Sequence, residues 1–260
     1  MELYGLPDQE DMDAVLDHVA EIRNLYKKHN LPVLAGDNML VAVRTMSFLQ
    51  DKRFVRAVDE RIAGMGSDLG GGEPNKVWRL HTYVWCCKNA LALVGDLVEC
   101  GVHMGLYSGV MLSLVDLVAV NKKIYMYDTF TGLDENYSNE RERKQTAEVY
   151  QIPDWEQTVR DSLAKWPHAI VVKGTVPDSL EDTAPDKVAF LHLDMNAAEA
   201  EVAALNFFEE RLTPGAIILL DDFGRLEHVE IFLAMKAWFD DRYLPILELP
   251  TGQGLVVWRP

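Results

Sequence analysis

The chain has 260 residues, of which 48% are hydrophobic, and a formal net charge of −16. This length allows one full-sized core with some appended helices. The negative charge repels nucleic acid phosphates, and no basic stripe interleaved with aromatic residues offsets it, so nucleic acid is not an expected partner. No run is long enough for a membrane span and the start lacks a signal-peptide pattern, so we expect a cytoplasmic protein that does not bind membranes.

The N-terminal part of the chain has the apolar periodicity of surface helices. Three segments are predicted to be helical: residues 9–30, residues 37–49 with Asp37-Asn38 as the cap, and residues 54–62. The glycine-rich stretch 64–74 is the predicted linker. We therefore expect residues 1–72 to form a helical extension and residues 73–260 to form the main domain.

The main domain alternates apolar strands with amphipathic helices, which is typical of a mostly parallel α/β sheet with crossover helices. Seven strands are predicted, at residues 96–101, 123–128, 169–173, 188–194, 216–221, 245–249 and 254–258. Helices are expected near residues 75–93, 107–120, 154–165, 197–211 and 228–240. Only Pro250-Thr251-Gly252-Gln253 separates the last two strands, which predicts a C-terminal antiparallel hairpin on a Rossmann-like sheet.

A glycine turn follows the first strand of this sheet. Gly101 and Gly105 leave room for a ligand to approach the backbone at the start of the next helix. Glu99 disfavours a pyrophosphate and favours a ligand with an amine, a hydroxyl or a positive charge. Asp128, at the tip of the second strand, is placed to hold a ribose diol. S-adenosylmethionine (SAM) meets these demands; the alternative is that the glycines serve only the turn of the α/β fold.

Three carboxylates follow two later strands. Asp194 ends one predicted strand, and Asp221 and Asp222 end the next. If these strands are neighbours, the carboxylates converge on the edge of the sheet where open α/β proteins bind ligands. Clustered carboxylates repel one another, and an all-oxygen set favours a hard cation such as Mg²⁺. The alternative is that these aspartates cap the helices that follow them.

A polar segment, residues 134–144, follows the second strand directly. A loop that covers a bound ligand lies at this position in such sheets. The mixed charge of the segment is equally typical of a solvated helix face. Both interpretations, a lid and an exposed helix, stay open at this point.

Several ordered motifs together resemble the macrocin O-methyltransferase family. They are Val98-Glu99-Cys100-Gly101-Val102 with Gly105, Tyr127-Asp128-Thr129-Phe130-Thr131-Gly132-Leu133, Leu193-Asp194, and Leu212-Thr213-Pro214-Gly215 running to Asp221-Asp222. The similarity covers roughly residues 76–258. It implies a class I, SAM-dependent O-methyltransferase that acts on a hydroxyl of a sugar or another vicinal-diol small molecule. It also implies that Asp194, Asp221 and Asp222 hold a Mg²⁺ ion, which binds two neighbouring hydroxyls of the acceptor.

The SAM site is expected to include residues of the glycine turn and of the loops after the second and third strands: Glu99, Gly101, Gly105, Tyr107, Ser108, Asp128, Thr129, Phe130 and Gly174. Asp194 is also an expected catalytic residue, although the family usually has Asp-Gly-Asp where this chain has Asp194-Met195-Asn196. The family's proposed base is a lid histidine, and this chain has no His between Asp128 and His168. The candidate bases are therefore Tyr137, Glu135, His103 and His192.

Two other functions were weighed against the methyltransferase. The first is an NAD(P)-dependent oxidoreductase, but Gly101, Gly105 and Gly109 do not follow the dinucleotide pattern G-x-G-x-x-G. The second is a non-catalytic binding protein with a SAM-type fold, for which the missing lid histidine leaves room. We also expect a homo-oligomer, with contacts through the apolar N-terminal helices and Phe207-Phe208.

Overall fold

The computed structural model describes residues 9–36, 39–64, 76–147 and 155–260. The chain divides into two compact units, Met1–His81 and Thr82–Pro260. The predicted linker falls almost wholly on residues 65–75, which lie outside the described residues. The domain boundary expected at residue 72 therefore stays a prediction.

The first unit contains helices and a small hairpin: α1 (Gln9–Lys28), β1 (Val33–Gly36), β2 (Met39–Ala42), the 3-10 turn η1 (Ser47–Gln50), α2 (Lys52–Gly64) and the start of α3 (Val77–Ala90). The helix predicted over residues 37–49 is wrong, because β1 and β2 pair there as antiparallel strands. Gly36 pairs with Met39, and the predicted cap, Asp37-Asn38, lies outside the described residues. Short apolar segments fit the periodicity of a helix as well as that of a strand, and the pairing of the backbone decides between the two.

The second unit is built on the predicted seven-stranded sheet, in the order β5-β4-β3-β6-β7-β9-β8. Its strands are β3 (Asp96–Cys100), β4 (Ile124–Asp128), β5 (Ala169–Lys173), β6 (Val188–Leu193), β7 (Leu212–Leu220), β8 (Leu247–Glu248) and β9 (Gly254–Val257). The first five are parallel, whereas β9 runs antiparallel to both β7 and β8. The predicted fold class, with its C-terminal antiparallel hairpin, is confirmed.

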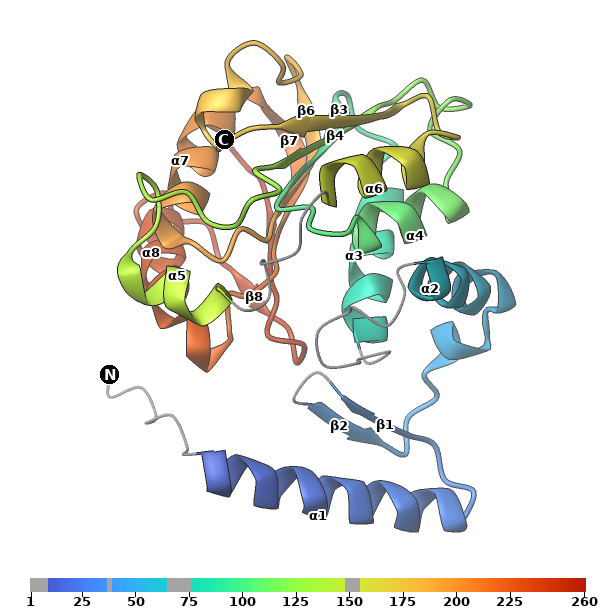
Figure 1. The fold of residues 1–260 in the computed structure, drawn as a ribbon. Helices are drawn as coiled ribbons and strands as arrows, with labels where there is room; N and C mark the ends of the chain where they lie inside the picture. The colour runs from blue at the N-terminus through green and yellow to red at the C-terminus, as the bar shows by residue number, and fades with distance from the viewer. Residues whose placement is uncertain (1–8, 37–38, 65–75, 148–154) are drawn as a thin grey trace. The chain divides into compact units, whose positions relative to one another are not determined.

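Helices cover both faces of this sheet (Figure 1). On one side lie α3, α4 (Leu106–Leu114) and α6 (Trp155–Leu163); on the other lie α7 (Ala198–Phe208) and α8 (Val229–Asp240), with the 3-10 turns η4 (Asp178–Leu180), η5 (Glu209–Arg211) and η6 (Leu226–His228) in the connections. The face under α7 and α8 forms a large apolar core that includes Leu191, Ile218 and Phe208. Phe208 is fully buried in this core, so its predicted place in a subunit contact is wrong.

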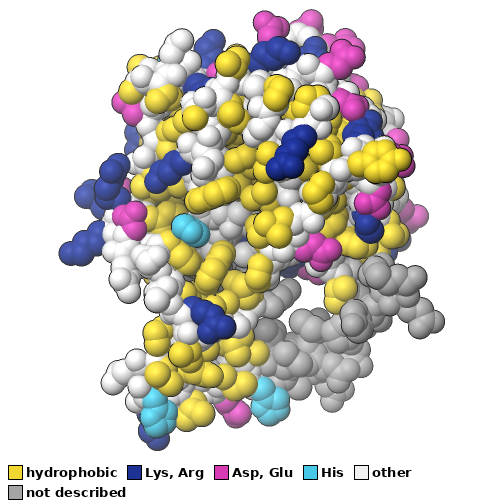
Figure 2. All heavy atoms as spheres, turned by 180° about the vertical axis from the view of Figure 1, so that it is seen from behind, with side chains coloured by type: hydrophobic (Ala, Val, Ile, Leu, Met, Phe, Trp, Pro, Cys, Tyr) yellow, Lys and Arg dark blue, Asp and Glu magenta, His cyan; other side chains and the backbone are white. Residues whose placement is uncertain are grey.

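The surface mixes apolar and charged groups. Seen from behind, hydrophobic side chains reach the surface among scattered charged ones (Figure 2). The exposed large hydrophobic residues of the second unit include Val94, Leu233 and Tyr243. Among the described helices, none is long and apolar enough to cross a membrane. Exposed apolar groups of this kind occur at subunit contacts, and the homo-oligomer stays a prediction.

Candidate active site

The parallel strands β3, β6 and β7 end side by side, so the residues that follow them meet at one edge of the sheet. The backbone N–H of Asp194 donates to the carbonyl of Cys100 at 2.8 Å, and that of Asp221 donates to the carbonyl of Leu193 at 2.9 Å. These bonds continue the ladder by one residue beyond each strand. Both carboxylates therefore lie at the carboxyl edge, where the order of the strands requires them to be.

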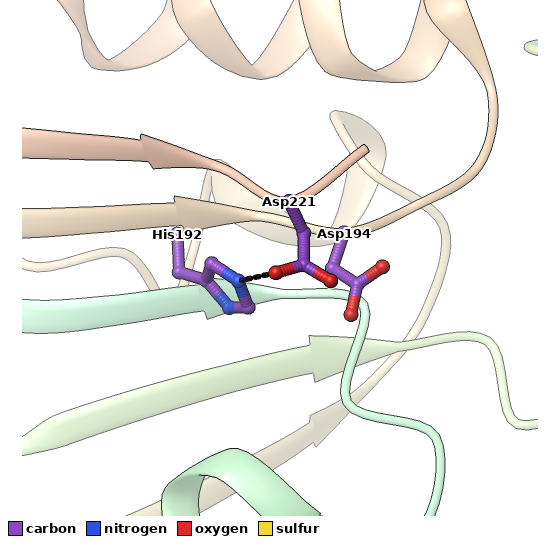
Figure 3. A group of neighbouring side chains, drawn as sticks. All are labelled: His192, Asp194 and Asp221. Atoms are coloured by element: carbon purple, nitrogen blue, oxygen red, sulfur yellow. Dashed lines mark ion pairs between the residues drawn. The ribbon is translucent and has the colours of Figure 1, made fainter. Parts of the chain in front are cut away.

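Three side chains converge at this edge (Figure 3). One potential ligand atom from each of His192, Asp194 and Asp221 lies within 4.8 Å of the others. His192 and Asp221 are buried, whereas Asp194 is half-buried. The site thus combines two fixed carboxylates with a buried imidazole.

His192 lies between two acidic side chains. Its Nδ1 is 3.5 Å from Oε1 of Glu99, and its Nε2 is 3.5 Å from Oδ1 of Asp221. Burial lowers the pKa of His192, but the hydrogen bonds and charges of Asp221 and Glu99 outweigh it and raise the pKa from 6.5 to about 10. In the metal-free protein, the two carboxylates thus favour the protonated form of the imidazole. In this arrangement His192 acts as the counter-ion of both carboxylates.

Asp222, the third predicted metal ligand, faces other partners. Its carboxylate lies 3.8 Å from Nε of Arg225 and 4.0 Å from Nε2 of His228. It is 8% exposed and follows Asp221 directly, so it stays close to the site without joining the group of three. Its role as a metal ligand remains a prediction.

The glycine turn after β3 is organised by Asp128. The Oδ2 atom of Asp128 accepts the backbone N–H groups of Val102 and His103, both at 2.7 Å, and its Oδ1 accepts that of Phe130 at 2.7 Å. Gly101 has a φ of +90°, and a Cβ there would overlap the carbonyl oxygen of Asp194. Only glycine fits this position, so the turn and the loop after β6 are packed backbone against backbone.

Glu99 lies beneath the same turn and is 1% exposed. Its Oε2 accepts a hydrogen bond from the hydroxyl of Ser108 and one from the hydroxyl of Tyr83 at 3.3 Å. Burial raises the pKa of Glu99, and the neighbouring His192 opposes this rise. Glu99 and Ser108 are thus part of a buried polar network next to the glycine turn.

A comparison with protein families decides the identity. The model of the macrocin-O-methyltransferase (TylF) family matches residues 78–243, a span that includes the glycine turn, Asp128 and the strand-end aspartates. The chain belongs to the macrocin-O-methyltransferase family. It is therefore a SAM-dependent O-methyltransferase, and the family assignment favours this enzyme over the oxidoreductase and the non-catalytic binding protein. A comparison with curated protein sequences finds no match.

Solved structures share the fold of this methyltransferase. The O-methyltransferase NovP is 17% identical, with a TM-score of 0.64 over 82% of this chain and 100% of its own. The calicheamicin methyltransferase CalS11 is 16% identical, with a TM-score of 0.60 over 79% of this chain and 93% of its own. The Podospora anserina methyltransferase PaMTH1, solved with S-adenosylhomocysteine (SAH), is 11% identical and has a TM-score of 0.55 over 99% of this chain and 100% of its own.

The other predicted cofactor residues of the methyltransferase lie around the turn. Gly105 has a φ of +71° and directly precedes α4. The backbone N–H of Gly174 donates to the carbonyl of Asp128 at 2.9 Å, which ties the loops after β4 and β5 together. The hydroxyl of Thr129 donates to the carbonyl of Gly132 at 2.6 Å. The loops expected to bind SAM thus form one connected surface, and the contact of each residue with SAM remains a prediction.

Tyr107 has a partner that the sequence did not predict. Its hydroxyl lies 3.2 Å and 3.1 Å from the two carboxylate oxygens of Asp221, and its side chain is 5% exposed. Its contact with SAM stays a prediction. Its hydroxyl joins the first turn of α4 to the carboxyl edge of the sheet.

The donor set of the methyltransferase fits a Mg²⁺ ion. Mg²⁺ is usually held by one or two carboxylates, with water and substrate oxygens completing an octahedron. Asp194 and Asp221 supply two such carboxylates close together. His192, the third member of the group, lies 3.5 Å from Asp221. Asp194 and Asp221 are therefore the residues that would hold the ion.

The predicted lid contains a short helix, α5 (Glu140–Thr146), after a turn. Glu142 is 3% exposed, and its carboxylate accepts two backbone N–H groups, that of Asn139 at 2.8 Å and that of Ala198 at 2.9 Å. The hydroxyl of Tyr137 donates to Asp178 at 2.8 Å, and this bond raises the pKa of Tyr137. The segment is thus attached to α7 and to the loop after β5, and it differs from a helix that only faces solvent.

The candidate bases differ in their surroundings. A phenol with a raised pKa holds its proton more tightly, which disfavours Tyr137 in this state. Glu135 is exposed, and His103 lies in the glycine turn with a φ of +47°. His192 is charged between two carboxylates. The identity of the base remains open.

The sequence analysis missed three polar residues of the site. Gln253 contacts Asp221, Tyr83 contacts Glu99, and Glu201 accepts the backbone N–H of Met195 at 3.2 Å. All three are at most 1% exposed. Polar residues inside apolar segments were the available signal: Tyr83 and Glu201 lie in helices that pack on the sheet, and Gln253 precedes an apolar strand.

Proposed function

We propose that this protein uses Mg²⁺ to methylate one hydroxyl of a vicinal diol on a sugar. The observation that supports the proposal is the pair of carboxylates, Asp194 and Asp221, held close together at the carboxyl edge of the sheet. The glycine turn that is expected to bind SAM touches the backbone of Asp194 through Gly101. The two substrates would therefore be bound side by side.

In this mechanism, the residues of the chain mainly bind and orient the cation and the two substrates. Asp194 and Asp221 would hold the cation, and His192, 3.5 Å from Asp221, helps to fix the position of that carboxylate. The bound cation would lower the pKa of an attached hydroxyl, whose proton would pass to water or to a base of the site. SAM would supply the methyl group, which forms a bond to this oxygen while its bond to sulfur breaks and SAH leaves. Catalysis then depends mainly on placing the two reacting atoms in line.

The class of acceptor follows from the relatives and from the chemistry of the edge. The family is named after a macrolide O-methyltransferase, and a second structure of CalS11 describes that enzyme as a TDP-rhamnose 3'-O-methyltransferase. A cation on two carboxylates keeps several coordination positions for water or substrate oxygens, so two adjacent hydroxyls can bind it together. A sugar with neighbouring free hydroxyls meets this requirement.

The first test is removal of the metal. A chelator should abolish SAH production from SAM and a nucleotide-linked hexose, and excess Mg²⁺ should restore it. Asp194→Asn and Asp221→Asn should each lower kcat/KM by about 100-fold or more, while calorimetry in chelator shows unchanged SAM binding. Asp186→Asn is the matched control, because Asp186 is exposed and precedes the opposite end of β6. Full activity of the wild-type protein in chelator would contradict the metal mechanism.

The second test concerns the diol. The hexose with two adjacent free hydroxyls should be methylated, and the analogue that lacks the neighbouring hydroxyl should react at least about tenfold more slowly, because one of its two oxygen ligands is lost. Mass spectrometry of the product measures both reactions. Equal rates for the two acceptors would exclude binding of the diol by the cation.

A further inference from the structure

The C-terminal hairpin reaches the metal-binding edge. Strand β9 pairs antiparallel with β7, and Leu220 lies opposite Gly254. One residue further, this register places Gln253 beside Asp221. The backbone N–H of Gly224 also donates to the carbonyl of Gly252 at 2.7 Å, which fixes the turn of the hairpin to the loop after β7.

Gln253 is bound at both ends of its side-chain amide. Its Nε2 donates to Oδ1 of Asp221 at 2.7 Å, and its Oε1 accepts the hydroxyl of Thr251 at 2.9 Å. An ionised carboxylate only accepts hydrogen bonds, so the amide nitrogen must face Asp221. Thr251 then holds the other end of the amide. Gln253 is 0% exposed and Thr251 3% exposed, so water does not compete with these bonds.

Groups from three separate elements contact the Asp221 carboxylate. Gln253 comes from the hairpin, Tyr107 from the first turn of α4 and His192 from the end of β6. Together they restrict rotation of the carboxylate about its Cβ–Cγ bond. Mg²⁺ demands near-ideal octahedral geometry, so a ligand that is already oriented binds it more tightly than one that rotates.

We propose that Gln253 is a positioning residue that holds the Asp221 carboxylate in the orientation needed to bind the divalent cation. This inference rests on the proposed function. Gln253 acts through Asp221 and does not itself touch the cation or the substrates. Its effect should therefore appear in the affinity for the metal and not in the affinity of the metal-free protein for SAM.

The test is metal binding by the full-length protein with Mn²⁺ as the probe, measured from the electron paramagnetic resonance of free Mn²⁺. Gln253→Met keeps the length of the side chain and removes both hydrogen bonds. It should raise the Kd for Mn²⁺ by about 10- to 100-fold, the range found when partners of metal ligands are lost. Calorimetry in chelator should show unchanged SAM binding, and saturating Mg²⁺ should restore most of kcat. Gln157→Met, at an exposed glutamine on α6, is the control.

A second variant covers the case in which Gln253→Met does not fold. Thr251→Val keeps the shape of the side chain and removes the hydroxyl that holds the amide, so it should weaken Mn²⁺ binding in the same direction by a smaller factor. Wild-type Mn²⁺ affinity in folded Gln253→Met, or in Thr251→Val if Gln253→Met does not fold, would overturn the inference. If Asp221→Asn binds Mn²⁺ as well as the wild type does, the proposed metal site itself is wrong, and the inference falls with it.

Discussion

Gly101 lies in the turn that is expected to bind SAM. Its backbone contacts the backbone of Asp194, a proposed metal ligand. Gly101→Ala should destabilise the protein by about 2 kcal/mol or more, because φ is positive there and the added Cβ overlaps the backbone of Asp194. Urea unfolding measures this change. Gly64→Ala is the matched control, since a Cβ at Gly64, the last residue of α2, has nothing within 4 Å. Equal stability of the two variants would show that the contact is relaxed in solution.

Glu201 makes the stability of the metal-free protein depend on pH. Burial raises the pKa of Glu201 from 4.5 to about 8, and the charge of Asp222 adds to this rise. The folded protein therefore keeps a proton that the unfolded chain loses above pH 4.5. The contribution of Glu201 to the free energy of unfolding should be fully present below pH 4.5. It should fall by at most about 1.4 kcal/mol per pH unit as the pH rises toward 8.

Glu201→Gln separates this effect from other titrations, because the neutral amide still offers an acceptor to the backbone of Met195. In chelator, urea unfolding between pH 5 and pH 8 should show that the variant gains stability relative to the wild type as the pH rises. A constant difference across this range would mean that Glu201 is ionised in the folded protein.

Strand ends could be predicted from the sequence at the residue scale, whereas hydrogen-bond partners could not. Asp194 and Asp221 follow apolar runs directly, so strand order alone brings them together. The contact of Asp128 with a ribose stays a prediction, and the backbone N–H groups that its carboxylate accepts from the glycine turn had no local signal in the sequence. The bond from Gln253 to Asp221 depends on the register of β9 against β7, which no local pattern encodes.

At the scale of elements, Glu142 joins the predicted lid to α7. This helix follows the loop that carries Asp194. The first residue of α7 has no cap from its own side, since Ala197 precedes it without a side-chain hydrogen bond. Glu142 supplies this cap from α5 and also completes the capping box of α5 with Asn139. One carboxylate thus stabilises the starts of two helices that lie far apart in the sequence.

Glu142→Ala should therefore loosen both helices. We expect faster amide hydrogen exchange at the starts of α5 and α7 together, and a loss of about 1 to 2 kcal/mol in the free energy of unfolding. Hydrogen-exchange mass spectrometry measures the local effect. Glu140→Ala is the control, because Glu140 is exposed on the same helix and pairs with the exposed Lys144. Faster exchange in α5 alone would show that the cap on α7 is dispensable.

The strands and helices of the second unit were predictable because their apolar runs are long and buried. The β1–β2 hairpin was not, because its strands have only four residues each and Leu40, Val43 and Met46 also fit a helix. Here pairing between segments overrides local periodicity. The first unit has few long apolar segments, so its sequence gives little evidence to distinguish a helix from a hairpin.

At the scale of the whole molecule, the expected homo-oligomer can be tested on α1. Ile22 and Leu25 on this helix are 40% and 56% exposed. If they form the subunit contact, the double variant Ile22→Glu and Leu25→Glu should dissociate the oligomer, because charges would be buried at the contact. Sedimentation equilibrium should then change from a multiple of 29.4 kDa to 29.4 kDa itself. Glu21→Gln is the control, and a wild-type mass of 29.4 kDa would contradict the oligomer.

The backbone contact between Gly101 and Asp194 has a thermodynamic consequence. A ligand that shifts the glycine turn must also shift the loop that carries Asp194, because no space separates them. If SAM binds the turn and a cation binds the loop, each should change the affinity for the other, and by the same factor, since linkage between two sites is reciprocal. Titrating SAM with and without the cation, and the cation with and without SAM, then measures one coupling free energy twice.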